Sequence, residues 1–389
     1  MNPIKYPLAT ATWDQAEYDA IQRVVDSGMF TMGPNVQKFE NQFSKYMGSL
    51  YAVMVNSGSS ANLLMVAALL YTEHNALKAG DEVIVPAVSW STTYYPIHQY
   101  GLKMRFVDID LETLNYDLDQ LEDAITDETR LIMVVNLLGN PNNFKRIQSM
   151  IGDRNIRICE DNCESMGAEF DSKKAGTYGV MGSFSSFFSH HISTMEGGLI
   201  VTDDEELFHI LLSLRSHGWT RHLPKYNKVC GEKSDDQFKE SFRFVLPGYN
   251  VRPLELSGAI GVEQLKKLPS IIQARRKNGA LLHEMLLDHP DIMIQKEIGK
   301  SSWFGFSLVI RPGSTVTREQ LVSKLQMIGM ECRPIVAGNF TKNAVMKYFD
   351  AQIAGELMNA DHIDQNGLFV GNHHYPVTEA IEALSQLRF

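Results

Sequence analysis

The sequence contains few cysteines and lacks any long apolar run. Its four cysteines form no CxxC pair and no dense framework, which disfavours a disulfide scaffold and fits a reducing compartment. The longest apolar run covers residues 63–71. That run is well short of the roughly 20 residues that span a bilayer. The N-terminal residues also lack the apolar core of a signal peptide. We therefore expect a cytoplasmic protein with no membrane association.

Positive charge is also in deficit. The chain has 36 Lys and Arg against 46 Asp and Glu, a formal net charge of −10, and no Lys/Arg-rich run. This balance provides no electrostatic footprint for nucleic acid or for an anionic membrane. A bound phosphate would have to be held locally, by backbone amides and a few cations.

What the sequence does contain is a regular alternation of short apolar segments and helical patterns. Continuous apolar strands that alternate with helices indicate an α/β fold with a mostly parallel sheet covered on both faces. Strands are predicted at 51–55, 82–85, 105–108, 131–136, 157–160, 184–188 and 199–202. Helices are predicted at 59–70, 118–125, 144–151 and 207–214.

The two ends of the chain carry further helix signals. Thr12 and Gln15 form a capping-box pattern before an N-terminal helix. A long charged helix is predicted from about Glu263 into the 280s, with Arg275, Arg276 and Lys277 exposed.

After this helix the pattern predicts a strand at 304–310 and a helix capped by Thr317 and Gln320. With 389 residues the chain is long enough for two domains. We expect a large domain over 1–265, which includes an N-terminal arm, and a small α/β domain over 266–389.

Three strand ends carry unusual residues, and ligands bind at the carboxyl ends of strands in such sheets. Small residues at 56–61 open a helix and leave amides free for a phosphate, although Gly-Ser is also an ordinary N-cap. Trp90 follows the next strand and suits either a planar ring or the core. Asp161 ends a hydrophobic strand and suits a protonated ring nitrogen or a metal. No histidine cluster accompanies Asp161, and Cys159 and Cys163 lack partners for a metal site, so no metal is expected.

The stretch 183–198, SFSSFFSHHISTMEGG, places His190 and His191 after a strand and just before Gly197 and Gly198. A histidine pair in a loop is more often hydrogen-bonded than catalytic. Together with the three strand ends, however, the stretch completes a set: a phosphate cradle, a stacking aromatic, a carboxylate for a pyridinium and a base. That set is typical of a pyridoxal phosphate site.

Over nearly its whole length the chain resembles the sugar aminotransferase family of fold-type-I pyridoxal phosphate enzymes, whose fold is aspartate aminotransferase-like. The resemblance is carried by TMGPNVQKFE (31–40), NSGSSANLL (56–64), VPAVSWSTT (85–93), EDNCESMGA (160–168), the stretch 183–198 and GYNVRPLELSGAIG (248–261).

By position, the resemblance implies a role for each of several residues. Gly58, Ser59 and Ser185 bind the cofactor phosphate, Trp90 stacks on the ring, Asp161 pairs with the ring nitrogen, Glu164 replaces a usual Gln or His near the ring hydroxyl, and Asn250 reaches the phosphate from the partner subunit of a homodimer.

One departure decides the expected activity. His190, six residues before Glu196, stands where the family has the lysine that bonds the cofactor covalently. Imidazole cannot form that bond, but it can act as a base near neutral pH. The exchange is typical of the 3-dehydratase group of deoxysugar biosynthesis.

The resemblance to this group implies a GDP-linked 4-keto-6-deoxy sugar as substrate. L-Glutamate would convert the cofactor to pyridoxamine 5′-phosphate, and the amine would condense with the 4-keto group. His190 would then take a proton as the 3-hydroxyl leaves, and hydrolysis would release ammonia.

Alternatives remain at this point. A sugar aminotransferase that tolerates the histidine, and a catalytically inactive homologue that binds a nucleotide sugar, both fit the exchange. Related dehydratases for CDP sugars use an iron–sulfur cluster, but their grouped cysteines are absent here, so no cluster is expected. Arg221 is a candidate for the substrate diphosphate or an ordinary surface residue, and His191 is expected to be structural.

Overall fold

The computed structural model describes residues 4–389, so the first three residues of the predicted large domain lie outside the described part. Its main feature is an eight-stranded sheet in the order β1-β9-β8-β5-β4-β2-β3-β15. Among the described strands of this sheet, seven run in one direction and β9 alone runs in the opposite direction. The strands are β1 (Tyr51–Val55), β2 (Glu82–Pro86), β3 (Lys103–Val107), β4 (Thr129–Val135), β5 (Arg157–Asp161), β8 (Met181–Ser185), β9 (Gly198–Thr202) and β15 (Ala351–Ile353).

Both faces of this sheet are buried, as continuous apolar strands require. In β4, Leu131 and Met133 pack on one face, whereas Ile132 and Val134 pack on the other. The first face is covered by α3 (Gly58–Leu69), α4 (Ser91–Gln99) and α7 (Glu205–Leu214). The second is covered by α2 (Pro34–Met47), α5 (Leu118–Ala124), α6 (Phe144–Ile151) and α9 (Glu255–Leu286). The predicted parallel, doubly covered sheet is therefore confirmed.

Helix α9 has 32 residues and begins earlier than the predicted start near Glu263. Gly258 and Gly261 weaken the helical pattern there, but both are needed for close packing against α2. A Cβ on Gly258 would lie 2.5 Å from the Val36 nitrogen, and one on Gly261 would lie 2.5 Å from the Phe39 ring. The contact between α2 and α9 overrides the low helix propensity of glycine.

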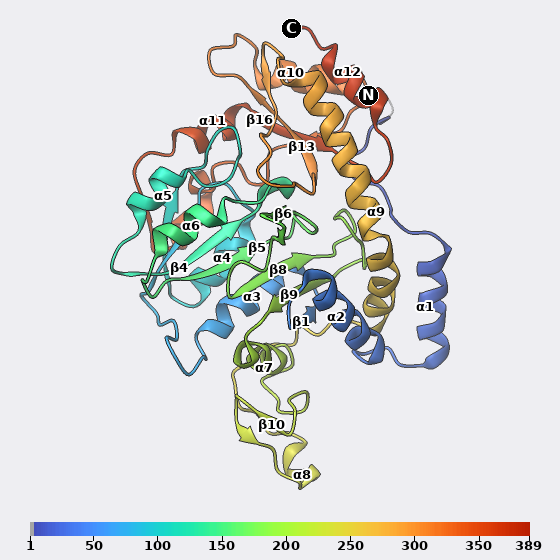
Figure 1. Ribbon diagram of the computed structural model, residues 1–389, viewed down its shortest axis with the longest axis vertical. Coiled ribbons are helices and arrows are strands. Elements are labelled where there is room, and N and C mark those ends of the chain that lie inside the picture. The colour runs from blue at the N-terminus through green and yellow to red at the C-terminus, as the bar shows by residue number, and fades with distance from the viewer. Residues whose placement is uncertain (1–3) are drawn as a thin grey trace.

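A second, antiparallel sheet packs against the C-terminal half of α9 (Figure 1). Its order is β12-β13-β16-β14, and α10 (Arg318–Met327) and α12 (Thr378–Ser385) cover it. The strands are β12 (Ile292–Met293), β13 (Gly305–Ile310), β14 (Cys332–Arg333) and β16 (Gly367–Gly371). Between them α11 (Met358–Asn366) follows β15, which pairs with β3 of the large sheet. The division at 265/266 stays a prediction.

Three local expectations differ from the structure. Helix α1 (Gln15–Ser27) is capped by Asp14 and Glu17 rather than by Thr12 and Gln15. Thr12 instead donates a hydrogen bond to the Gln264 side chain, 2.6 Å away. Strand β8 ends at Ser185, earlier than predicted, so residues 186–188 already belong to the following loop.

Arg275 is the third difference: it is buried, Arg276 is half-buried, and only Lys277 is exposed as predicted. Arg275 turns toward the backbone carbonyls of Trp303 and Phe304, which its Nη1 reaches at 3.3 and 2.8 Å. The predicted capping box of Thr317 and Gln320 at α10 is confirmed.

Residues 217–252 leave the large sheet as a projecting extension that carries β10 (Tyr226–Asn227), β11 (Gly231–Glu232) and α8 (Gln237–Glu240) (Figure 1). Within residues 4–389 no helix combines the length and apolarity needed to cross a bilayer. The same residues contain no group of three or more His, Cys, Asp or Glu side chains arranged to hold a metal ion.

The N-terminus of α2 is capped by the side chain of Glu255. We therefore expect substitution of Glu255 to lower the stability of the protein. Helix α2 has Gly33 as its N-cap and no side-chain cap of its own. The buried Glu255 carboxylate accepts hydrogen bonds from the amides of Gly33 (2.7 Å), Asn35 (2.5 Å) and Val36 (3.3 Å). We expect Glu255→Gln to destabilise the protein by about 1–3 kcal/mol, because it removes a charged acceptor from buried donors.

The measurement is the urea midpoint at unchanged slope. The matched control is Glu284→Gln, an exposed glutamate on the same helix, which should change stability by no more than about 0.5 kcal/mol. Equal midpoints for the two variants would contradict the capping role of Glu255.

Candidate active site

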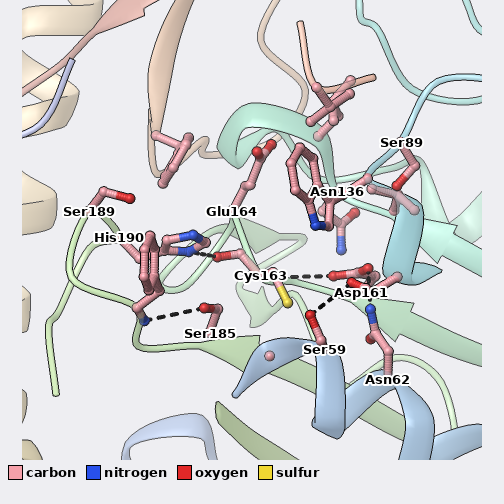
Figure 2. A pocket seen from close by; sticks show the side chains of 18 of the residues that line it. Ser59, Asn62, Ser89, Asn136, Asp161, Cys163, Glu164, Ser185, Ser189 and His190 are labelled. Atoms are coloured by element: carbon pink, nitrogen blue, oxygen red, sulfur yellow. Dashed lines mark hydrogen bonds between the residues drawn. The ribbon is translucent and has the colours of Figure 1, made fainter. Parts of the chain in front are cut away.

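A cavity of about 410 Å³ opens where β1, β2, β4, β5 and β8 end. This is the carboxyl edge of the sheet, where α/β folds bind ligands. Seven residues predicted from the sequence line this cavity, several of which are drawn in Figure 2: Gly58, Ser59, Trp90, Asp161, Glu164, Ser185 and His190. The structure therefore brings them together, while their individual roles stay predictions.

One end of the cavity is the N-terminus of α3. Ser57 caps this helix by accepting from the Ser60 amide at 3.0 Å, while the amides of Gly58 and Ser59 belong to the first turn, which has no intrahelical acceptors. A Cβ on Gly58 would lie 2.7 Å from the Ser185 Cβ and 2.8 Å from the Cys163 sulfur, so only glycine fits. This end of the cavity therefore suits a phosphate group.

Asp161 lies beside the first turns of α3, close to Ser59 and Asn62 (Figure 2), and three donors hold its carboxylate. Asn62 Nδ2 and Thr93 Oγ1 donate to Oδ2 at 2.7 and 2.8 Å, and the Cys163 amide donates to Oδ1 at 3.1 Å. Ser183 in turn donates to Asn62 Oδ1 at 2.6 Å. These bonds fix the orientation of the carboxylate, as pairing with a protonated ring nitrogen requires.

Glu164 is a carboxyl group that can be neutral at physiological pH. Burial raises the pKa of Glu164 to about 7, and the nearby charge of Asp161 also raises it. The Leu138 amide donates to Oε2 at 3.1 Å. In its protonated form Glu164 can donate a hydrogen bond, as the side chain of a glutamine would.

His190 is held by one short hydrogen bond from its Nδ1 to the Cys163 carbonyl, at 2.6 Å (Figure 2). A carbonyl oxygen only accepts, so in the neutral imidazole the proton lies on Nδ1 and Nε2 keeps its lone pair. Burial lowers the pKa of His190 to about 4, and the charge of Arg275 lowers it further. At neutral pH the imidazole is therefore uncharged, and Nε2 can accept a proton.

The remaining predicted residues lie elsewhere. His191 is buried behind the cavity, where its Nε2 donates to the Ser302 carbonyl at 3.2 Å. Asn250 is exposed and accepts from Arg252 Nε at 2.9 Å. Arg221 is exposed, with its guanidinium 4.4 Å from the centre of the Trp219 ring. Neither Asn250 nor Arg221 reaches the cavity of its own chain, and both belong to the 217–252 extension.

Several cavity residues were not predicted. Most of them come from distant segments, which no local pattern in the sequence connects with the motifs, whereas Asn62 and Glu196 lie inside the stretches 56–64 and 183–198. They include Asn62, Asn136, Glu196, Phe304, Arg333 and Phe369. Asn62 had a signal, because it lies one helical turn after Ser59 on α3. Within the described part of the chain, no lysine lines the cavity.

Comparisons with known proteins agree with this geometry. The model of the DegT/DnrJ/EryC1/StrS aminotransferase family matches residues 12–384. The GDP-4-keto-6-deoxy-D-mannose 3-dehydratase of Escherichia coli O55:H7 is 62% identical over 385 residues, which cover 99% of both chains.

Two solved structures, each 62% identical to this chain, agree as well. The E. coli GDP-4-keto-6-deoxy-D-mannose-3-dehydratase with bound hydrated PLP superposes with a TM-score of 0.98 over 99% of both chains. A GDP-4-keto-6-deoxymannose-3-dehydratase with a trapped PLP-glutamate geminal diamine has a TM-score of 0.97 and covers 98% of this chain and 99% of that one. The expected fold type is thus confirmed, and the chain belongs to the DegT/DnrJ/EryC1/StrS aminotransferase family.

Proposed function

We propose that this protein is a GDP-4-keto-6-deoxy-D-mannose 3-dehydratase that depends on pyridoxal phosphate, pyridoxamine phosphate and L-glutamate. It removes the 3-hydroxyl of the sugar and yields GDP-4-keto-3,6-dideoxy-D-mannose, ammonia and 2-oxoglutarate. The proposal is supported by the dehydratases that match almost the whole chain at 62% identity.

One observation carries the proposal: the cavity holds an uncharged imidazole at the position where the family has its lysine. His190 Nδ1 is fixed by the Cys163 carbonyl, which leaves Nε2 as the free base. Among the described residues that line the cavity there is no primary amine. A site built this way can move a proton but cannot hold the cofactor by a covalent bond.

The residues present fit the cofactor. The first turn of α3 with Ser185 suits its phosphate, the Asp161 carboxylate suits the ring nitrogen, and Trp90 lies at the cavity wall. When bound, the cofactor would supply an amine that condenses with the 4-keto group and a conjugated ring that takes up the electron pair of a removed proton, and the 3-hydroxyl would leave with such a pair. We propose that His190 Nε2 takes up the proton released in this step.

The proposal extends to partners and context. We propose a homodimer in which Asn250 of each extension reaches the phosphate site of the other subunit, because Asn250 is exposed and remote from its own cavity. Arg221 on the same extension would bind the substrate diphosphate. The product is a precursor of colitose in the O-antigen of lipopolysaccharide, and the reaction takes place in the cytoplasm.

The direct test is a product assay. Purified protein incubated with pyridoxal phosphate, L-glutamate and GDP-4-keto-6-deoxy-D-mannose should form equal amounts of the 3-deoxy product and ammonia, measured by mass spectrometry and an ammonia assay. An amino sugar in place of ammonia would identify an aminotransferase. Cofactor binding without any product would favour an inactive homologue.

The assignment of His190 as the base is tested by substituting it and its neighbour His191 separately. His190→Asn should retain the cofactor but lose turnover by roughly 10²–10⁴-fold, the usual contribution of a general base. His191→Asn is the control, because His191 lies outside the cavity and should mainly affect stability. Wild-type turnover in His190→Asn with loss in His191→Asn would move the base to His191.

The missing covalent bond is tested separately. Borohydride treatment of the protein with bound pyridoxal phosphate should leave no pyridoxyl group on the chain, because no lysine lines the cavity. Peptide mass spectrometry after digestion makes the measurement. A reduced adduct on any lysine would contradict the proposed site.

Glu164 predicts a pH dependence near neutrality. Its pKa is raised to about 7, so it is protonated and can donate to the ring hydroxyl below that pH, and it loses this bond above it. Cofactor affinity should therefore fall by roughly tenfold from pH 6 to pH 8.5. In Glu164→Gln this component should be absent, because the amide does not titrate. The same pH dependence in both proteins would exclude Glu164 as its source.

A further inference from the structure

Arg275 is a buried guanidinium that the proposed function does not use. It is 5% exposed on α9, and burial lowers the pKa of Arg275 to about 10, so it stays charged at neutral pH. Within residues 4–389 no carboxylate pairs with it, and its Nε has no hydrogen-bond partner. Burying an unpaired charge is costly, so its position calls for a physical explanation.

The contacts of Arg275 lead to the cavity. Its Nη1 donates to the carbonyls of Trp303 and Phe304 at 3.3 and 2.8 Å, and Asn372 Nδ2 also donates to the Trp303 carbonyl at 2.9 Å. The Phe304 ring lines the cavity, with its centre 5.0 Å from that of His190. One short segment thus lies between the guanidinium and the imidazole.

His191 adds a second connection. Its Nε2 donates to the Ser302 carbonyl, and its ring centre lies 5.7 Å from that of Phe304. Both histidines of the loop therefore pack against the segment 301–304. Arg275 bonds to two carbonyls of this segment, so its loss would allow the segment to shift and would change the packing of the His190 ring.

The charge of Arg275 provides a second influence on His190, in addition to the packing of the segment 301–304. The titratable groups around His190 are Asp161, Cys163, Glu164 and Glu196 at the cavity, His191 beside it, Arg333 on β14 and Arg275 on α9. After burial, the charge of Arg275 lowers the pKa of His190, whereas Asp161 and the Cys163 carbonyl raise it. The charge of the unpaired guanidinium thus opposes protonation of the imidazole.

We propose that Arg275 is a positioning residue for His190, which anchors the segment 301–304 against the imidazole and places an unpaired guanidinium near that ring. The proposal rests on the proposed function only where it treats His190 as the base. The effect on the imidazole itself can be measured without cofactor or substrate.

The test uses two substitutions with different consequences. Arg275→Met removes both the charge and the hydrogen bonds, whereas Arg275→Lys keeps the charge with a single ammonium in place of the planar guanidinium. The matched control is Arg276→Met, which removes the neighbouring cation of α9. Arg276 also contacts the segment 301–304, through the Ser301 carbonyl, but it lines a hollow outside the cavity of His190 and is not among the charges that act on the His190 pKa, so it controls for the electrostatic effect.

The first readout is the titration of His190 in cofactor-free protein, followed by NMR of ¹⁵N-labelled histidine and assigned with His190→Asn. In Arg275→Met the His190 midpoint should rise by about one pH unit, the order expected when one nearby charge is removed. Arg275→Lys and Arg276→Met should leave the midpoint near that of the wild type. A midpoint unchanged in Arg275→Met, or equally raised in Arg276→Met, would overturn the electrostatic role.

The second readout is turnover against substrate affinity. Both Arg275 variants should lower kcat by roughly tenfold or more while KM stays within about twofold, because the imidazole is misplaced and substrate contacts are not. If Arg275→Met does not fold, Arg275→Lys decides: wild-type kcat in that variant would overturn the anchoring role. If the wild type shows no dehydratase activity, the proposed function fails, while the cofactor-free titration still decides the effect of Arg275 on His190.

Discussion

The hydrogen bond between His190 Nδ1 and the Cys163 carbonyl is the interaction on which the site depends. It joins the loop after β8 to the loop after β5, which carries Glu164 and directly follows Asp161, the last residue of β5. Because the acceptor is a backbone carbonyl, one nitrogen of the imidazole is fixed as a donor and the other is left as a base. This single bond thus fixes the tautomer and the orientation of the imidazole.

Burial shifts the pKa values of two ionisable groups in the cavity, His190 and Glu164. The His190 pKa is lowered to about 4 and the Glu164 pKa is raised to about 7 by the same loss of solvent, so near pH 7 the imidazole is neutral and the carboxyl group is partly protonated. The Asp161 carboxylate accepts hydrogen bonds from Asn62, Thr93 and the Cys163 amide. One cavity therefore holds a neutral imidazole, a carboxyl group that titrates near neutral pH and a hydrogen-bonded carboxylate side by side.

Much of the large sheet was predictable because its signals are local. The helix at 144–151 was predicted to the residue, and β1 likewise. The start of α9 was missed, since Gly258 and Gly261 look like helix breakers until Val36 and Phe39 are seen against them. These contacts are between segments far apart in the sequence, which propensity cannot register.

The site residues show the same difference between local signals and contacts between distant segments. Residues next to a motif, such as Asp161 and His190, were found from the sequence, whereas Phe304 and Arg333 come from another part of the chain and carry no motif. Arg275 was predicted as exposed because it is charged. Its spacing from Leu268, Ile271, Ile272 and Leu282, however, places it on the buried face of α9. For Arg275, the helical spacing predicts burial correctly, whereas the charged side chain suggests exposure.

The antiparallel placement of β9 has a consequence for how such chemistry can change. Because β8 and β9 are hydrogen-bonded neighbours of opposite direction, the loop between them returns along the same sheet and needs no crossover helix. The residue at position 190 is therefore held by its loop and by Cys163, and not by the order of the strands. An exchange of the functional group at that position can redirect the reaction while the topology of the fold is inherited intact.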